Sequence, residues 1–462
     1  MTTRRDLMAA LSLAAGAAAL PAQPAPAQPA SVQPAPGTRP KSADGRLPVN
    51  RERAYRLMRQ AGLDAIIGAL DTNARYLTNI DSLTSVMGLS RRVIGIMPAD
   101  PRQPLIAVIP NLEIGRHTAP DREWPEIVTY SFASGTDTEA LRNRTSLSLA
   151  EDVTALAGRP PAENAGMTDI ERGWAANERA LPVANAATPE LAVRKVLATL
   201  GLTRARVGID DAGLGMALTQ LGLTALQIVP AENLFLRLRL VKSQVEIERM
   251  RRVATLNAAA ARASIATFQP GMTMADIKAS FFAEVARRGG RPKFIVAGMV
   301  SGLRHGELVP HEPLLVDCVA SFDGYTGDFA RTVVLGTPPP VLETRTRLAA
   351  QVAEALTASL RPGQLYSEIR TRGQALLKQM GGDFPMGVGP HSVGMDHSED
   401  PWRHDLPFHA REDVRLEAGM TITIDLPTLE PGWGSMHLEN LILVTPDGGE
   451  WLDRIDDPLY RI

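Results

Sequence analysis

Two aspartates in the last third of the chain have a spacing that suits a shared cation. Asp317 and Asp328 lie on either side of Asp323 and Gly324, a residue pair that favours a tight β-turn. A hairpin that turns there would place the two aspartates on neighbouring strands, where cross-strand side chains lie about 5 Å apart. Two carboxylates that close repel each other unless a cation lies between them. The spacing therefore predicts a divalent metal site, with Mn, Co, Fe or Zn as candidate ions.

A second pair of acids and one histidine extend this pattern. Asp425 ends one apolar run, and Glu439 lies within another. A buried carboxylate at the end of a strand is costly unless it is paired, so we expect metal ligands at both positions. His391 is flanked by glycines, which allow the backbone to approach closely.

Seven of the eight histidines follow residue 300, and they supply further candidates. Three of these are candidate catalytic residues, namely His305, His397 and His437. The single cysteine, Cys318, excludes an intramolecular disulfide and a cysteine-based zinc site. Any metal must therefore use histidine, aspartate and glutamate.

Hydrophobic patterns in the last third of the chain predict the strands and helices that would position these residues. Strands are expected at 314–319, 330–335, 420–426 and 438–444, and helices at 342–360 and 366–380. Two capping boxes, at Ser243–Glu246 and Thr273–Asp276, predict the starts of two further helices.

The first half of the chain has a different character. Short apolar runs alternate there with helical patterns, which is typical of an α/β layer architecture. Strands are expected at 65–70, 93–97, 105–109, 207–210 and 226–230. We place a domain boundary between residues 235 and 236, which divides the chain into domains of residues 47–235 and 236–462.

The amino terminus has the layout of an export signal. Arg4 and Arg5 precede an apolar run, Met8–Leu20, that is too short to cross a bilayer of about 30 Å. This pattern predicts a twin-arginine signal peptide over residues 1–27 and a periplasmic location. A Pro/Ala-rich linker would follow at residues 28–46. The alternative is an Ala-rich tail with two incidental arginines.

The ordered motifs resemble a known family. The matching segments are Val316–Cys318, Gly327–Thr332, His391–Asp396, Leu416–Asp425 and Glu439–Gly448. In order and spacing they resemble peptidase family M24, the metallopeptidases of the pita-bread fold, which includes Xaa-Pro dipeptidases, Xaa-Pro aminopeptidases and creatinase. Ala61–Ala65 and Asn73–Thr78 resemble the amino-terminal domain of creatinase and prolidase. The resemblance implies an α/β amino-terminal domain and an α+β catalytic domain with a curved antiparallel sheet.

The resemblance also implies two divalent metal ions. Their ligands would be Asp317, Asp328, His391, Asp425 and Glu439, with Asp328 and Glu439 bridging the ions. A metal-bridging hydroxide would attack the amide, and Asp425 would pass the proton to the leaving amine. The implied activity is cleavage of a dipeptide or short peptide, with proline after the scissile bond. The implied assembly is a homodimer. Nucleic acid is not an expected partner, since the formal net charge is −2, and neither is a membrane in the mature form.

The chain departs from the family pattern at the candidate ligands and histidines. Asp425 stands where the family has a glutamate, which is longer by one C–C bond, about 1.5 Å. The family's second histidine falls on Ser398. Its neighbour His397 is a candidate replacement, although on a strand it would face the opposite side.

Two further histidines resemble positions that face the substrate or the metals. His305 resembles the substrate-facing histidine upstream of the first ligand. His437 replaces an arginine of proline-specific members, and strand alternation points it toward the metal face. Arg331 is expected to form a salt bridge behind the metals.

Three other functions remain open. A metal-free creatinase-type C–N hydrolase would have the same fold, as would a metallo-lyase that acts on a small non-peptide substrate. A binding protein without activity is the third. The first and third are disfavoured because all five positions keep ligand-type side chains.

Overall fold

The computed structural model describes residues 46–89, 92–116, 125–130, 166, 168, 186–298, 303, 306–454 and 457–462. The predicted signal peptide, all but the last residue of the predicted linker, and His305 lie outside these described residues. Every helix in the described ranges is too short or too polar to cross a membrane.

A six-stranded mixed sheet organises the first half of the chain. The strand order is β4-β3-β2-β1-β5-β6. The bounds are β1 Ala65–Gly68, β2 Ile94–Pro98, β3 Ile106–Pro110, β4 Glu126–Tyr130, β5 Arg206–Ile209 and β6 Gln227–Pro230. β2 runs antiparallel to β1 and β3, and the other neighbouring pairs are parallel. The five strands predicted for this half are confirmed, and β4 is an additional strand.

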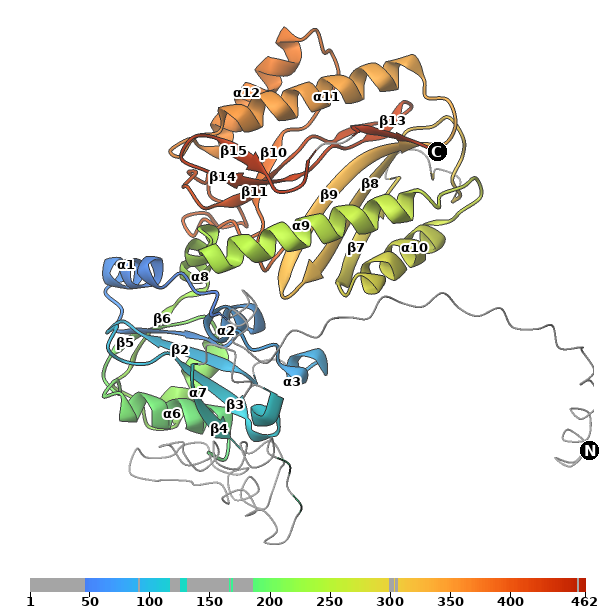
Figure 1. The fold of residues 1–462 in the computed structure, drawn as a ribbon. Coiled ribbons are helices and arrows are strands. Elements are labelled where there is room, and N and C mark those ends of the chain that lie inside the picture. Colours follow the sequence, from blue (N-terminus) through green and yellow to red (C-terminus); the bar gives the residue numbers. More distant parts are fainter. Residues whose placement is uncertain are drawn as a thin grey trace, which may run out of the picture. The chain divides into compact units, whose positions relative to one another are not determined.

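Helices cover both faces of this sheet because alternate strand residues point to opposite sides. The helices are α1 Arg51–Ala61, α2 Asp71–Thr78, α3 Leu83–Val86, α6 Pro189–Thr199, α7 Ala212–Gln220 and α8 Glu232–Leu240, with a 3₁₀ turn, η2, at Asn111–Arg116. Ala65 and Ile67 of β1 pack with buried residues of α6 and α7, whereas Ile66 packs with those of α1 and α8 (Figure 1). This layering confirms the α/β architecture expected for the first half.

Two helices that begin at the predicted capping boxes lead into the second half. In α9, Gln244–Ile265, the Ser243 side chain accepts from the Glu246 amide and the Glu246 side chain accepts from the Ser243 amide. Thr273 and Asp276 make the same reciprocal pair at the start of α10, Met274–Arg287. Both predicted starts are therefore confirmed.

The second half contains two four-stranded sheets and a two-stranded ribbon. The first sheet has the order β16-β9-β8-β7, with β7 Arg291–Ala297, β8 Leu314–Phe322, β9 Tyr325–Val334 and β16 Leu459–Arg461. The second has the order β10-β11-β14-β15, with β10 Gly389–Ser392, β11 Thr421–Asp425, β14 Leu441–Val444 and β15 Gly449–Trp451. The ribbon pairs β12 Thr428–Glu430 with β13 Gly434–Met436.

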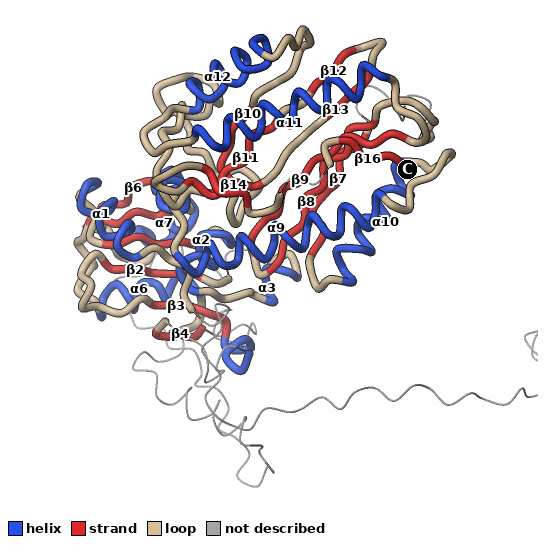
Figure 2. Tube along the Cα trace, turned by 45° about the horizontal axis from the view of Figure 1, so that its top comes forward, coloured by secondary structure: helices blue, strands red, loops and turns tan. Residues whose placement is uncertain are grey.

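Each four-stranded sheet packs against its own pair of helices (Figure 2). Buried residues of α9 and α10 form one core with β7, β8 and β9. Buried residues of α11, Pro340–Ser359, and α12, Tyr366–Gln379, form another with β11 and β14. A β-bridge pairs Ala330 of β9 with Glu439, two residues before β14, and links the two sheets through N–O distances of 3.3 and 3.1 Å. The two sheets therefore meet at the acids that the sequence singled out.

Candidate metal centre

The β8–β9 hairpin brings the first acid pair together. Asp323 and Gly324 form its turn, with φ of 49° and 83°, so both occupy the left-handed region that such a turn requires. Asp317 is opposite Ala330 in the register, and Asp328 is opposite Val319. The two aspartates therefore lie on the same face as diagonal neighbours, and not directly opposite each other at the separation of about 5 Å that was expected.

The second sheet supplies the remaining candidate ligands. His391 on β10 is opposite Thr423 on β11, and Asp425 ends β11 as predicted. Glu439 lies outside any strand, because β14 begins only at Leu441 and not at residue 438 as expected. Its backbone is instead paired with Ala330 of the hairpin, which sets Glu439 between the two sheets.

His391 lies at the centre of the acids. Its Nε2 is 3.8 Å from Asp328 Oδ2, 3.6 Å from Asp425 Oδ1 and 3.7 Å from Glu439 Oε1. These separations are longer than hydrogen bonds. They are close to the spacing of about 3.4 Å between tetrahedral ligands whose bonds to an ion are about 2.1 Å.

Two of the other candidate histidines also reach this cluster. His397 Nε2 lies 3.0 Å from Asp328 Oδ2, and its ring centroid is 5.1 Å from that of His391. The strand-parity argument against His397 was wrong, because β10 ends at Ser392 and the turn that follows carries His397 back to the acids. His437 Nε2 lies 3.7 Å from Glu439 Oε2, on the side that the sequence predicted.

Burial and mutual repulsion shift the pKa values of these groups. Burial, then the charges of Asp328 and Asp425, raise the pKa of Asp317 well above its usual value, and the pKa of Glu439 rises for the same reasons. Burial opposes protonation of His391, but Asp425 and the other acids raise its pKa to about 9. The converse holds for Asp425, whose pKa is lowered mainly by His391 against the effect of burial.

The donor set fits divalent cations. Asp317 Oδ1 and Asp328 Oδ1 are buried and accept no hydrogen bond from the described residues, whereas Asp328 Oδ2 lies 3.0 Å from His397 Nε2. Orphaned buried carboxylate oxygens are costly, so they point to a cation that would neutralise them. Three sets of donor atoms each lie within 4.8 Å of one another: Asp328/His391/His397, Asp317/His437/Glu439 and His391/Asp425/Glu439. All five predicted ligands could thus hold metal ions here.

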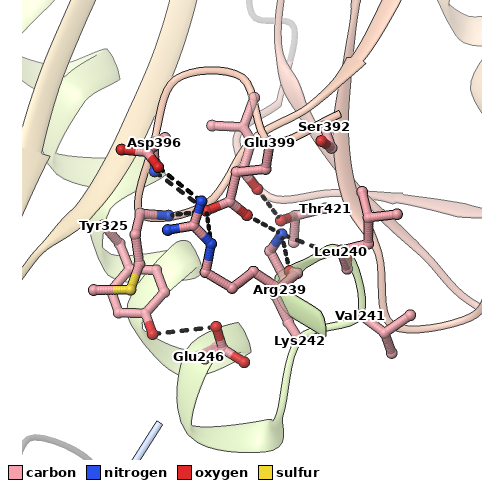
Figure 3. A network of polar contacts seen from close by, with 12 residues as sticks. Arg239, Leu240, Val241, Lys242, Glu246, Tyr325, Ser392, Asp396, Glu399 and Thr421 are labelled. Carbon is pink, nitrogen blue, oxygen red and sulfur yellow. Dashed lines mark hydrogen bonds and ion pairs between the residues drawn. The ribbon is translucent and has the colours of Figure 1, made fainter. Parts of the chain in front are cut away.

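A buried charge network, which the sequence did not reveal, supports the turn that carries His397 (Figure 3). Lys242 Nζ donates to Glu399 Oε2 at 2.8 Å, and Glu399 Oε1 accepts from the amides of Met395 and Asp396. Arg239 donates to Asp396 Oδ2 at 2.8 Å. Lys242, between α8 and α9, is 157 positions from Glu399, so no local pattern could have shown the pair.

Buried side chains of β9 hold the backbone around Glu439. Arg331 Nη1 donates to the carbonyl oxygens of Glu439 and Ala330, at 3.0 and 2.8 Å. Thr332 Oγ1 donates to the His437 carbonyl and accepts from its amide. A salt bridge was predicted for Arg331, and that remains a prediction; the contacts described here are to backbone oxygens, and they fix the segment that carries both Glu439 and His437.

Comparisons with known proteins agree with this geometry. Residues 248–446, which include all five candidate ligands, match the model of metallopeptidase family M24. An Xaa-Pro dipeptidase of Pyrococcus furiosus is 24% identical over 232 residues, which cover 48% of this chain and 65% of that protein.

Solved structures extend the likeness to most of the chain. A dipeptidase of Pyrococcus horikoshii superimposes with a TM-score of 0.63 at 18% identity, covering 89% of this chain and 99% of that one. An Xaa-Pro dipeptidase of Bacillus anthracis gives a TM-score of 0.60 at 17% identity, with the same coverage. The predicted fold class, an α/β domain followed by a pita-bread domain, is confirmed, and the M24 match supports the expected class of metallopeptidase.

Proposed function

We propose that this chain is a metal-dependent hydrolase that cleaves the amide bond of a dipeptide or short peptide, with Xaa-Pro dipeptides as the preferred class. One observation carries the proposal: four carboxylates and an imidazole converge where the two sheets meet, and buried oxygens of Asp317 and Asp328 accept no hydrogen bond from the described residues. The names of the similar dipeptidases support the choice of substrate.

The chemistry divides between the metals and the chain. Two divalent ions, bound by the five ligands, would supply Lewis acidity and a nucleophile at neutral pH. Asp425 is the most exposed of the three carboxylates near His391, with 26% of its side chain accessible, so it is the one best placed to reach the leaving amine, in the proton-transfer role that the family resemblance implies. His397, with 39% of its side chain accessible, is placed to contact the substrate.

The test is metal content and peptide cleavage measured on the same samples. Wild type and Asp328→Ala would be compared by mass spectrometry of bound metal and by hydrolysis of an Xaa-Pro and a non-proline dipeptide panel, with His404→Ala as a control on an exposed histidine. We expect about two ions per chain in wild type and in the control, and loss of metal and cleavage together in Asp328→Ala. Metal without cleavage would reject the peptide substrate, and no metal after incubation with Mn, Co or Zn would favour the metal-free hydrolase.

Export and assembly complete the proposal. The residues at 1–27 support twin-arginine export to the periplasm, which fractionation of cells that express wild type and Arg4→Lys/Arg5→Lys would test. The family resemblance supports a homodimer. Sedimentation equilibrium that finds only monomer would reject it.

A further inference from the structure

The two oxygens of the Glu439 carboxylate face two different imidazoles. Oε1 lies 3.7 Å from His391 Nε2, and Oε2 lies 3.7 Å from His437 Nε2. A carboxylate that bridges two ions presents one oxygen to each of them. Glu439 therefore has a nitrogen donor beside each oxygen, and only the His391 side belongs to the ligand set implied by the family resemblance.

His437 is held in this orientation without a partner for its nitrogen. The residue is 6% exposed, and its Nε2 forms no hydrogen bond with any described residue. Its amide and carbonyl are both bonded to the Thr332 hydroxyl on β9, at 3.1 and 3.2 Å. A buried polar atom without a partner is costly, so the ring nitrogen calls for a partner at this position.

We infer that His437 is a direct metal ligand, which together with Asp317 and Glu439 forms the second cation position of the centre. The inference rests on the proposed metal-dependent function. One donor atom of each residue lies within 4.8 Å of the others, and Asp317 contributes a buried oxygen that also lacks a partner. Two donors on opposite sides of an ion, each bonded at about 2.1 Å, are about 4.2 Å apart. The three donor atoms therefore need to move only slightly closer together to bind one ion.

A His437 ligand changes which metal the position beside Asp317 prefers. Without His437 that position offers carboxylate oxygens alone, a donor set that suits Mg or Mn. A neutral imidazole adds a donor without adding negative charge, and it favours Zn or Fe over Mn. His437 is also too buried to meet the substrate as an acid or base, in contrast to His397. The structure thus assigns it to the metal and not to proton transfer.

The test is calorimetric titration of the metal-free full-length chain with Zn²⁺ and, separately, Mn²⁺. His437→Gln keeps the size and polarity of the side chain but removes the imidazole, and His404→Ala is the matched control. We expect two ions to bind wild type and the control. In His437→Gln one zinc ion should bind at least about tenfold more weakly, with a smaller change for Mn²⁺. Equal zinc affinities in wild type and in a folded His437→Gln variant would overturn the inference.

A second measurement covers the case in which the variant does not fold. In wild type loaded with Co²⁺, NMR should show paramagnetically shifted ring N–H signals from histidines at both ions. Signals confined to one ion would refute the role of His437. Wild type that binds no metal would reject the proposed function as well, whereas two ions with a nitrogen ligand at only one would reject this inference alone.

Discussion

The buried pair of Lys242 and Glu399 provides the sharpest test of how the chain positions the turn that carries His397. Their side chains are 0% and 1% exposed, and Nζ lies 2.8 Å from Oε2. Breaking a buried pair costs about 3–5 kcal/mol, and Lys242→Met would leave Glu399 with one buried cation, Arg239, whose Nε lies 3.4 Å from Oε1. For a cooperative unit of about 150–250 residues, each kcal/mol lowers Tm by about 2–4 °C. Lys242→Met should therefore lower Tm by about 6–20 °C.

The assay is thermal unfolding of a double-mutant cycle. Glu399→Gln keeps an acceptor for the Met395 and Asp396 amides. This variant should also be less stable than wild type, since Lys242 then keeps its backbone acceptors but has no carboxylate partner. The double variant removes both charges, so its loss of stability should be smaller than the sum of the two single losses by about 0.5–3 kcal/mol.

An exposed ion pair serves as the control for this cycle. Arg251 and Glu450 lie 2.6 Å apart, but their side chains are 43% and 47% exposed. Arg251→Met should cost no more than about 1 kcal/mol. A Lys242→Met protein whose Tm lies within about 2 °C of wild type, or strictly additive losses in the cycle, would refute the reasoning.

Three further predictions follow from the described contacts. Asp317→Asn should raise the stability of the metal-free protein, because burial and the neighbouring acids raise the pKa of Asp317 and so penalise its charged form. It should also reduce the rise in Tm on adding zinc, and a lower Tm than wild type in chelator would contradict this. Burial raises the pKa of Glu246 from 4.5 to about 7, so ionising this carboxyl group destabilises the folded state. The loss of folding free energy is absent below about pH 4.5 and reaches its full value above about pH 7. Glu246→Gln should therefore gain stability relative to wild type between pH 5 and pH 8, by at most about 3 kcal/mol, and a pH-independent difference in Tm would disprove it. Gly394→Ala would place a Cβ atom 2.2 Å from Glu399 Oε2, and should cost about 1–3 kcal/mol; a Tm equal to wild type would show that the buried carboxylate can move.

Much of the fold could be predicted because its signals are local. A capping box needs only a side chain and an amide three positions away, so Ser243 and Thr273 marked the starts of α9 and α10. The Asp323-Gly324 turn requires left-handed backbone that these residue types tolerate, so the hairpin and its two acids were visible in the sequence.

The order of the candidate ligands was also a property of the sequence. Asp317, Asp328, His391, Asp425 and Glu439 are spaced as in the M24 metallopeptidases, and residues 248–446 match that family. Their roles as ligands remain predictions, but the structure brings all five to one place.

Only the tertiary structure decided which further groups join them. Strand parity failed for His397 because β10 ends at Ser392, and the next turn is shaped by Glu399 and its buried cations. Glu439 is placed by a bridge to Ala330, more than 100 positions away in the chain. Such contacts depend on how the two sheets and the segment between α8 and α9 pack together, and no periodicity within a single segment encodes that packing. The sequence by itself thus determined which side chains can bind metal, and the packing of the sheets determined which of them meet.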